Sequence, residues 1–122
     1  MGVTNSFGTA TLADVISYLV ANTTHVAIGT GTTAFTTGDT TLETETVRNA
    51  RQTYSQTTSS VTTSGYFNST QANGSSITEY GVFNDDTTGT MASRDLATAI
   101  AKTANVEIWV DETYNVTITL NT

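Results

Sequence analysis

Threonine makes up about one residue in four of this 122-residue chain, which contains neither proline nor cysteine. Threonine is branched at Cβ, which suits an extended strand, and its hydroxyl keeps a solvent-facing strand wettable without adding charge. One Trp, five Tyr and four Phe accompany many Val and Ile residues, a content that favours a packed core over disorder. The chain is therefore expected to fold mainly into β-sheet.

The charge balance excludes two classes of partner. Eleven acidic residues stand against four basic ones, which gives a formal net charge of −7. Such a surface repels nucleic-acid phosphates and anionic lipid, so neither nucleic acid nor membrane is expected as a partner.

The apolar stretch from Leu12 to Ala21 is too short to span a bilayer, and the first residues lack the pattern of a signal peptide. An acidic excess is also typical of halophilic proteins, so the composition fits either a halophilic host or an ordinary acidic domain.

One segment has the periodicity of a helix. Thr11 and Asp14 form a variant of the N-terminal capping box, and Asn22 suits the C-terminal end. We therefore expect a short N-terminal amphipathic helix of about ten residues, preceded by an N-terminal arm (residues 1–10). Residues 11–122 are expected to form a single helix-plus-β-sandwich domain. The apolar stripe of the helix consists of Leu12, Val15, Ile16, Leu19 and Val20.

The rest of the chain divides into strand-like segments separated by turns. The Gly-rich segment 29–39 is expected to be a long loop, with Phe35 as its anchor in the core. Hairpin turns are expected at Asn73-Gly74 and at Asp85–Gly89, and two successive hairpins favour an antiparallel β-sandwich of jelly-roll-like type. The expected strand segments are 24–29, 42–47, 52–67, 77–84 and 90–96.

The last segment alternates most regularly. Its apolar residues have even numbers, and most of the intervening positions are polar. Either one long strand continues through Glu112 with a bend, or a three-residue turn keeps both apolar sets on one face; we favour the long strand. Trp109 then lies on the polar side, partly exposed, and is a candidate subunit contact. The alternating residues are Val106, Ile108, Val110, Tyr114, Val116, Ile118 and Leu120.

No arrangement of residues points to catalysis. His25 is the only histidine and has no recognisable nucleophile and acid partners. Glu107 and Glu112 differ in parity, so they should point to opposite faces of a strand and cannot flank one glycosidic bond. We expect a non-enzymatic protein without a cofactor. The alternative is a Ca²⁺ site built from loop carboxylates of Asp85 and Asp86, joined by Asp39, Glu43 or Glu45.

Three stretches resemble small virion structural proteins of tailed phages and archaeal tailed viruses, of the tail-fibre-like or capsid-decoration type. The first is HVAIGTGTT at 25–33 with GDTTLETE at 38–45 and Arg48; the second is ITEYGVFN at 77–84 with GTMASR at 89–94; the third is IAKTA at 100–104 with residues 106–118. The resemblance implies scaffold roles: Glu79 and Arg94 as a cross-strand ion pair, and Phe83 and Ile100 in the core. Unlike those proteins, this chain has no proline between Thr32 and Asp39.

The expected function follows from this resemblance. The chain would be a symmetric building block on the capsid exterior (decoration, cement or vertex spike) or on the tail, located in the virion. Its partners would be copies of itself and other virion proteins, such as major capsid or tail proteins. Phe7 in the arm, Phe35 in the loop and Trp109 are the candidate subunit contacts. The alternative is a carbohydrate-binding or adhesin-like module whose aromatic residues stack on a host surface glycan.

Overall fold

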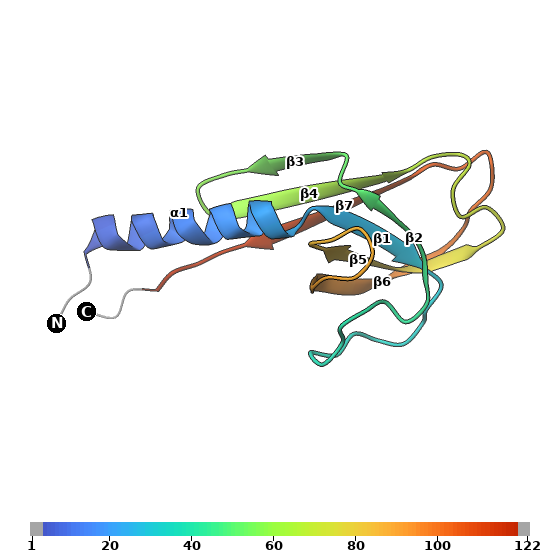
Figure 1. The fold of residues 1–122 in the computed structure, drawn as a ribbon, viewed down its shortest axis with the longest axis horizontal. Coiled ribbons are helices and arrows are strands. Elements are labelled where there is room, and N and C mark those ends of the chain that lie inside the picture. Colours follow the sequence, from blue (N-terminus) through green and yellow to red (C-terminus); the bar gives the residue numbers. More distant parts are fainter. Residues whose placement is uncertain (1–3, 120–122) are drawn as a thin grey trace.

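The computed structural model describes residues 4–119, which form one helix followed by seven strands in two antiparallel sheets (Figure 1). The mainly β, two-layer sandwich predicted from the sequence is confirmed, with one strand fewer than the eight of a jelly roll. The elements are α1 (Asn5–Asn22), β1 (His25–Gly29), β2 (Glu45–Ala50), β3 (Thr53–Gln56), β4 (Ser60–Phe67), β5 (Ser76–Phe83), β6 (Met91–Ala101) and β7 (Ile108–Asn115).

The strands are ordered β2-β1-β5-β6 in one sheet and β3-β4-β7 in the other. The predicted hairpin at Asp85–Gly89 joins β5 to β6 as expected. The predicted hairpin at Asn73-Gly74 is wrong, because β4 and β5 belong to different sheets and the chain crosses between the layers there. A hairpin between β3 and β4 was not predicted, because that segment alternates between Thr, Ser and Gln without an apolar period.

The main core lies between the two sheets. Every second residue of β4 is buried, as the period of a strand with one covered face requires. At Gly65 the layers approach so closely that a Cβ would lie 2.5 Å from the Val26 side chain. The core cluster is made of Val26, Ile28, Phe67, Ile77, Val82, Ile108 and Val110.

A smaller core covers the other face of the four-stranded sheet. Leu42, from the long loop between β1 and β2, packs there against Ala27 and Phe83. The predicted core position of Phe83 is therefore confirmed. The predicted core positions of Ile100 and Phe35 are wrong, since both side chains are exposed. The loop is anchored through Leu42, three residues before β2, and not through its aromatic residue.

Helix α1 is longer than predicted. Its N-cap is Thr4, whose hydroxyl accepts a hydrogen bond from the Phe7 amide at 3.3 Å. The predicted start at Thr11 is wrong, and residues 5–10 of the expected arm are helical; residues 1–3 lie outside the described residues. The segment from Asn5 to Ala10 contains one large apolar residue, so its helical period is invisible in the sequence.

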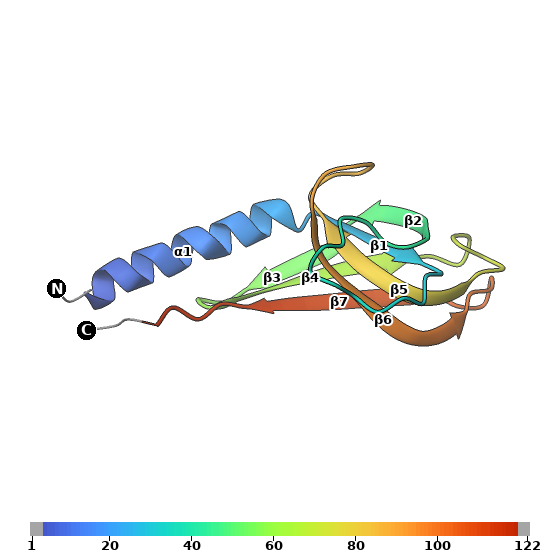
Figure 2. The ribbon, with the colours of Figure 1, turned by 90° about the horizontal axis from the view of Figure 1, so that it is seen from below.

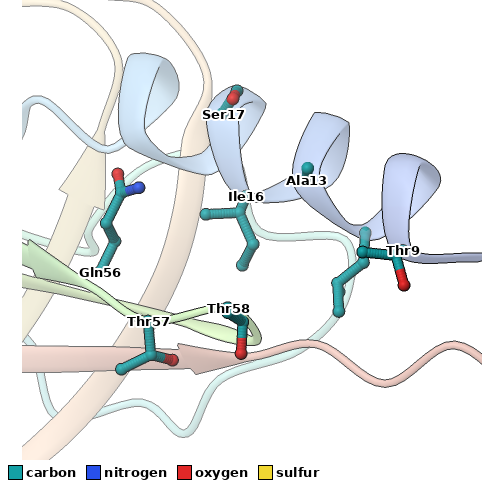
Figure 3. Close-up of a pocket in the computed structure, with 8 residues that line it drawn as sticks. Thr9, Ala13, Ile16, Ser17, Gln56, Thr57 and Thr58 are labelled. Carbon is teal, nitrogen blue, oxygen red and sulfur yellow. The ribbon is translucent and has the colours of Figure 1, made fainter. Parts of the chain in front are cut away.

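The second half of α1 is attached to the sandwich, and Ile16 within it is buried. The Thr23 hydroxyl lies 2.8 Å from that of Thr63 on β4, and the Arg51 guanidinium donates to the Val20 carbonyl at 2.6 Å. The rest of the helix extends past the sheets, as Figures 1 and 2 show, whereas Figure 3 shows Ile16 facing the turn between β3 and β4. An 18-residue helix is about 27 Å long, so its first turns project well beyond the main core.

The C-terminal segment forms one strand without a turn at Glu112. Residues 108–115 pair continuously with β4. The long-strand alternative is therefore confirmed. Trp109 points away from the core and is 55% exposed, as its parity predicted.

Candidate functional site

The densest polar arrangement is a buried ion pair beneath the loop of residues 30–44. The carboxylate of Glu79, on β5, is fully buried. One of its oxygens accepts hydrogen bonds from the amides of Gly31 at 2.7 Å and Thr44 at 2.8 Å, and the other from the amide of Glu43 at 2.9 Å. A single side chain thus holds both ends of a 15-residue loop through its backbone. We call this arrangement, with Arg94, the loop clamp.

Arg94, on β6, completes the loop clamp. Its Nε donates to Glu79 at 2.9 Å, its Nη2 to the Thr33 carbonyl at 2.6 Å, and its Nη1 to Asp39 at 3.2 Å. The cross-strand ion pair implied by the resemblance is therefore confirmed. The pair is diagonal, since Arg94 lies directly opposite Gly81 in the ladder.

The electrostatics favour the charged form of the clamp. Burial by itself would raise the pKa of Glu79, but the amides of Thr44, Glu43 and Gly31 and the Arg94 guanidinium outweigh it, and the pKa lies below its ordinary value. The hydrogen bond from the Thr36 amide is the main cause of a lowered pKa at Asp39. A carboxylate saturated with donors cannot take up a proton near neutral pH, so Glu79 is unsuited to acid-base catalysis.

The close contacts of the clamp explain one glycine of the sequence pattern. A Cβ at Gly31 would collide with the Glu79 carboxylate and would lie 2.5 Å from the Glu43 Cβ. At Gly38, in the middle of the loop, a Cβ would have only one neighbour, at 4.0 Å. Packing therefore requires glycine at position 31 but not at position 38.

The carboxylates proposed for Ca²⁺ do not come together. Asp39 pairs with Arg94, Glu45 pairs with Arg48 at 2.7 Å, and Asp85 accepts the amide of Asp86 within its own turn. Over residues 4–119 the structure has no group of three metal-ligating side chains. Glu45 and Asp85 thus stabilise their own local segments, whereas Asp39 joins the long loop to β6.

The remaining catalytic candidates are also placed apart. His25 Nδ1 lies 2.9 Å from the Thr24 hydroxyl, its neighbour in the chain. Glu107 is exposed while Glu112 is half-buried, which agrees with their predicted opposite orientation. Burial, and then the charge of Asp95, raises the pKa of Glu112. In the described part of the chain, every buried side-chain nitrogen and oxygen has a hydrogen-bond partner.

The three predicted contact residues are all exposed and lie on three different elements. Phe7 is 64% exposed on α1, Phe35 is 47% exposed in the long loop, and Trp109 is 55% exposed on β7. Trp109 lies against Tyr66, with ring centroids 4.8 Å apart and an interplanar angle of 39°. Beside Trp109, a cavity of about 250 Å³ opens between β6 and β7 and reaches the core residues Ile28 and Ile77.

Comparisons with known protein families, with curated proteins and with solved structures find no significant match to this chain. Within residues 4–119, no helix has the length and apolar content needed to cross a membrane.

Proposed function

We propose that this chain is a non-enzymatic structural subunit on the exterior of a tailed-virus particle, as a capsid decoration or vertex spike or as part of the tail. The proposal starts from the resemblance of three sequence stretches to small virion structural proteins. Its partners would be copies of the same chain and other virion proteins. The acidic, hydroxyl-rich surface agrees with a location in contact with solvent, and with a halophilic host.

The loop clamp is the observation that best supports this proposal. Residues from two of the matching stretches, Gly31, Asp39, Glu79 and Arg94, converge on it although they are distant in the sequence. They stabilise backbone and leave no group free for chemistry, which is the behaviour expected of a scaffold pattern. The shared residues thus preserve the shape of a projecting loop on a sandwich.

The decisive experiment is an electron-microscopic map of the virus particle in which this chain is traced. Mass spectrometry of purified particles would supply the copy number. We expect stoichiometric incorporation, with the chain on the outer surface. Particles that lack the chain, while it accumulates in the infected cell, would contradict the proposal.

The Tyr66–Trp109 pair, in which Trp109 is exposed and Tyr66 is half-buried, supports a second candidate, a carbohydrate-binding or adhesin-like module. Aromatic faces stack on sugar rings, and Asp111, which borders the cavity beside Trp109, could accept hydroxyl hydrogen bonds. A glycan array followed by calorimetry on the purified chain tests this candidate. Saturable binding that is lost in Trp109→Ala and retained in Phe35→Ala would favour it, whereas a pure scaffold binds no sugar.

A further inference from the structure

Lys102, which directly follows β6, is a buried basic residue whose hydrogen-bond acceptors are all neutral. Its side chain is 1% exposed, and its Nζ donates to Oδ1 of Asn73 at 3.0 Å and to the Thr103 carbonyl at 3.1 Å. Arg94, by contrast, is buried against the carboxylate of Glu79. Within residues 4–119, no carboxylate forms an ion pair with Lys102. Because a buried positive charge is costly unless an opposite charge compensates it, this position would gain from a carboxylate.

The residue that faces Nζ has a reactive sequence context. Asn73 is the one asparagine of the chain that is followed by glycine. Both residues are exposed, in the segment that crosses from β4 to β5. Gly74 has a φ of +87°, so the backbone itself requires glycine there. Without a side chain at position 74, nothing hinders the approach of its backbone nitrogen to the side-chain carbonyl of Asn73, which is the first step in the loss of ammonia from asparagine.

Hydrogen bonds fix the Asn73 side chain beside Lys102. The Gly74 amide donates to the Lys102 carbonyl, and the Lys102 amide donates to the Ser75 carbonyl, each at 2.9 Å. Nδ2 of Asn73 donates to the Ser69 carbonyl at 2.9 Å, so Oδ1 is the atom that faces Nζ. The crossing segment and the end of β6 lie together at the end of the molecule away from the termini (Figures 1 and 2).

We propose that Asn73 is a site of spontaneous deamidation and that the aspartate it leaves forms a salt bridge with Lys102. The Gly74 amide first leaves the Lys102 carbonyl, an opening expected of an exposed turn. Its nitrogen then attacks Cγ of Asn73, the bond from Cγ to Nδ2 breaks, and Nδ2 departs as ammonia with the proton from the Gly74 nitrogen. Water adds to Cγ of the resulting succinimide, which breaks the new bond and restores the peptide with aspartate at position 73. Addition of water at the other carbonyl gives isoaspartate, whose longer backbone does not fit the two hydrogen bonds to Lys102.

The exchange of amide for carboxylate improves the contact with Lys102. An accepting oxygen remains at Nζ and now carries charge, and a charge-assisted hydrogen bond is about twice as strong as a neutral one. The bond to the Ser69 carbonyl is lost, but it is exposed to solvent and its loss costs little. Deamidation at this position should therefore stabilise the chain. The inference is independent of the proposed virion role.

Intact-mass analysis of the full chain, sampled during incubation at pH 8, tests the inference. We expect one modification per chain, with the mass change that accompanies exchange of NH₂ for OH, and peptide mapping should place it at Asn73. Asn105, which is also exposed but is followed by Val106, should stay unmodified. The modified chain should contain mainly aspartate at position 73, and its midpoint of thermal unfolding should lie at least about 3 °C above that of the fresh protein.

Substitutions isolate the salt bridge. Asn73→Asp produces the product directly and should raise the midpoint by at least about 3 °C. In a Lys102→Met background the same substitution should give no gain, because methionine keeps an aliphatic side chain but not the charge. Asn105→Asp is the matched control, since it adds a negative charge at an exposed position to a chain of net charge −7 and should not raise the midpoint. Circular dichroism confirms that each variant is folded.

Three results would overturn the inference. The first is an Asn73 side chain that remains intact in the folded chain. The second is a product that is mainly isoaspartate, with a lowered midpoint. The third is an Asn73→Asp variant that gains no stability, or whose gain persists without the Lys102 ammonium.

Discussion

Replacing Glu79 by glutamine is the sharpest test of the loop clamp. The amide has the size of the carboxylate but only one accepting oxygen, so at least one pair of donors would face an NH₂ group. Either the amides of Gly31 and Thr44 or the amide of Glu43 and the Arg94 guanidinium would lose their acceptor. The substitution also leaves the guanidinium without its buried counter-charge.

The expected loss follows from these contacts. Removing one partner of a buried ion pair costs about 3–5 kcal/mol, against a total stability of about 5–15 kcal/mol for a domain. For a chain of this length, that loss lowers the midpoint of thermal unfolding by about 10–20 °C. Glu45→Gln is the matched control, because its pair with Arg48 is partly exposed and should be worth less than about 1 kcal/mol.

The loss of stability at acid pH tests the role of Glu79 independently. The folded pKa of Glu79 lies below its unfolded value of 4.5, so its contribution is complete above that pH and is lost as the pH falls through the folded pKa. Urea unfolding followed by circular dichroism at pH 7 and pH 4 should show a smaller acid-dependent loss in Glu79→Gln than in the wild type. An unfolding midpoint within about 2 °C of the wild type at pH 7 would refute the reasoning.

Three further predictions test other parts of the structure, two of them with a control substitution. Gly31→Ala should destabilise the chain by about 1–3 kcal/mol in urea titrations, because the new Cβ collides with the loop clamp. Gly38→Ala, which has open space around it, should change the stability by less than about 0.5 kcal/mol. Equal effects of the two substitutions would contradict the packing argument. Phe67→Ala should cost about 3–5 kcal/mol and Phe35→Ala less than about 1 kcal/mol in the same assay, and the reverse order would mean that the loop aromatic is the core anchor after all. Glu112→Gln should stabilise the chain, by less than about 1 kcal/mol at pH 8 and by a smaller amount at pH 5. The pKa of Glu112 is raised in the folded chain, so its ionisation opposes folding as the pH rises, and glutamine removes that effect. Melting curves that show destabilisation at pH 8 would refute this sign.

The strands and their orientation were the most predictable part of the fold. In β7 the alternation of apolar residues defined the buried face and the exposure of Trp109, because a strand with one covered face has a period of two. The β3–β4 hairpin escaped prediction because Thr and Ser suit either face of a sheet and carry no apolar period. The early start of α1 escaped it for a similar reason, since Gly8 and Thr9 are poor helix formers and only the Thr4 cap marks the boundary.

The candidate sites were less predictable than the strands. The Glu79–Arg94 pair followed from the resemblance, but the three loop amides that bind Glu79 did not, because backbone groups leave no mark in the sequence. Phe35 was assigned to the core because it is the largest apolar residue in its loop, yet Leu42 fills that position.

The loop clamp holds its loop almost entirely through backbone atoms, which makes the loop a site for inserting other peptides. Between Thr32 and Thr41, the only side chain that it engages is Asp39; the other clamp contacts go to backbone atoms. Foreign peptides of similar length that retain this aspartate could therefore be grafted in place of the natural stretch without disturbing the frame beneath. Under the proposed virion role, a grafted antigen or affinity tag would be displayed in many copies on each particle.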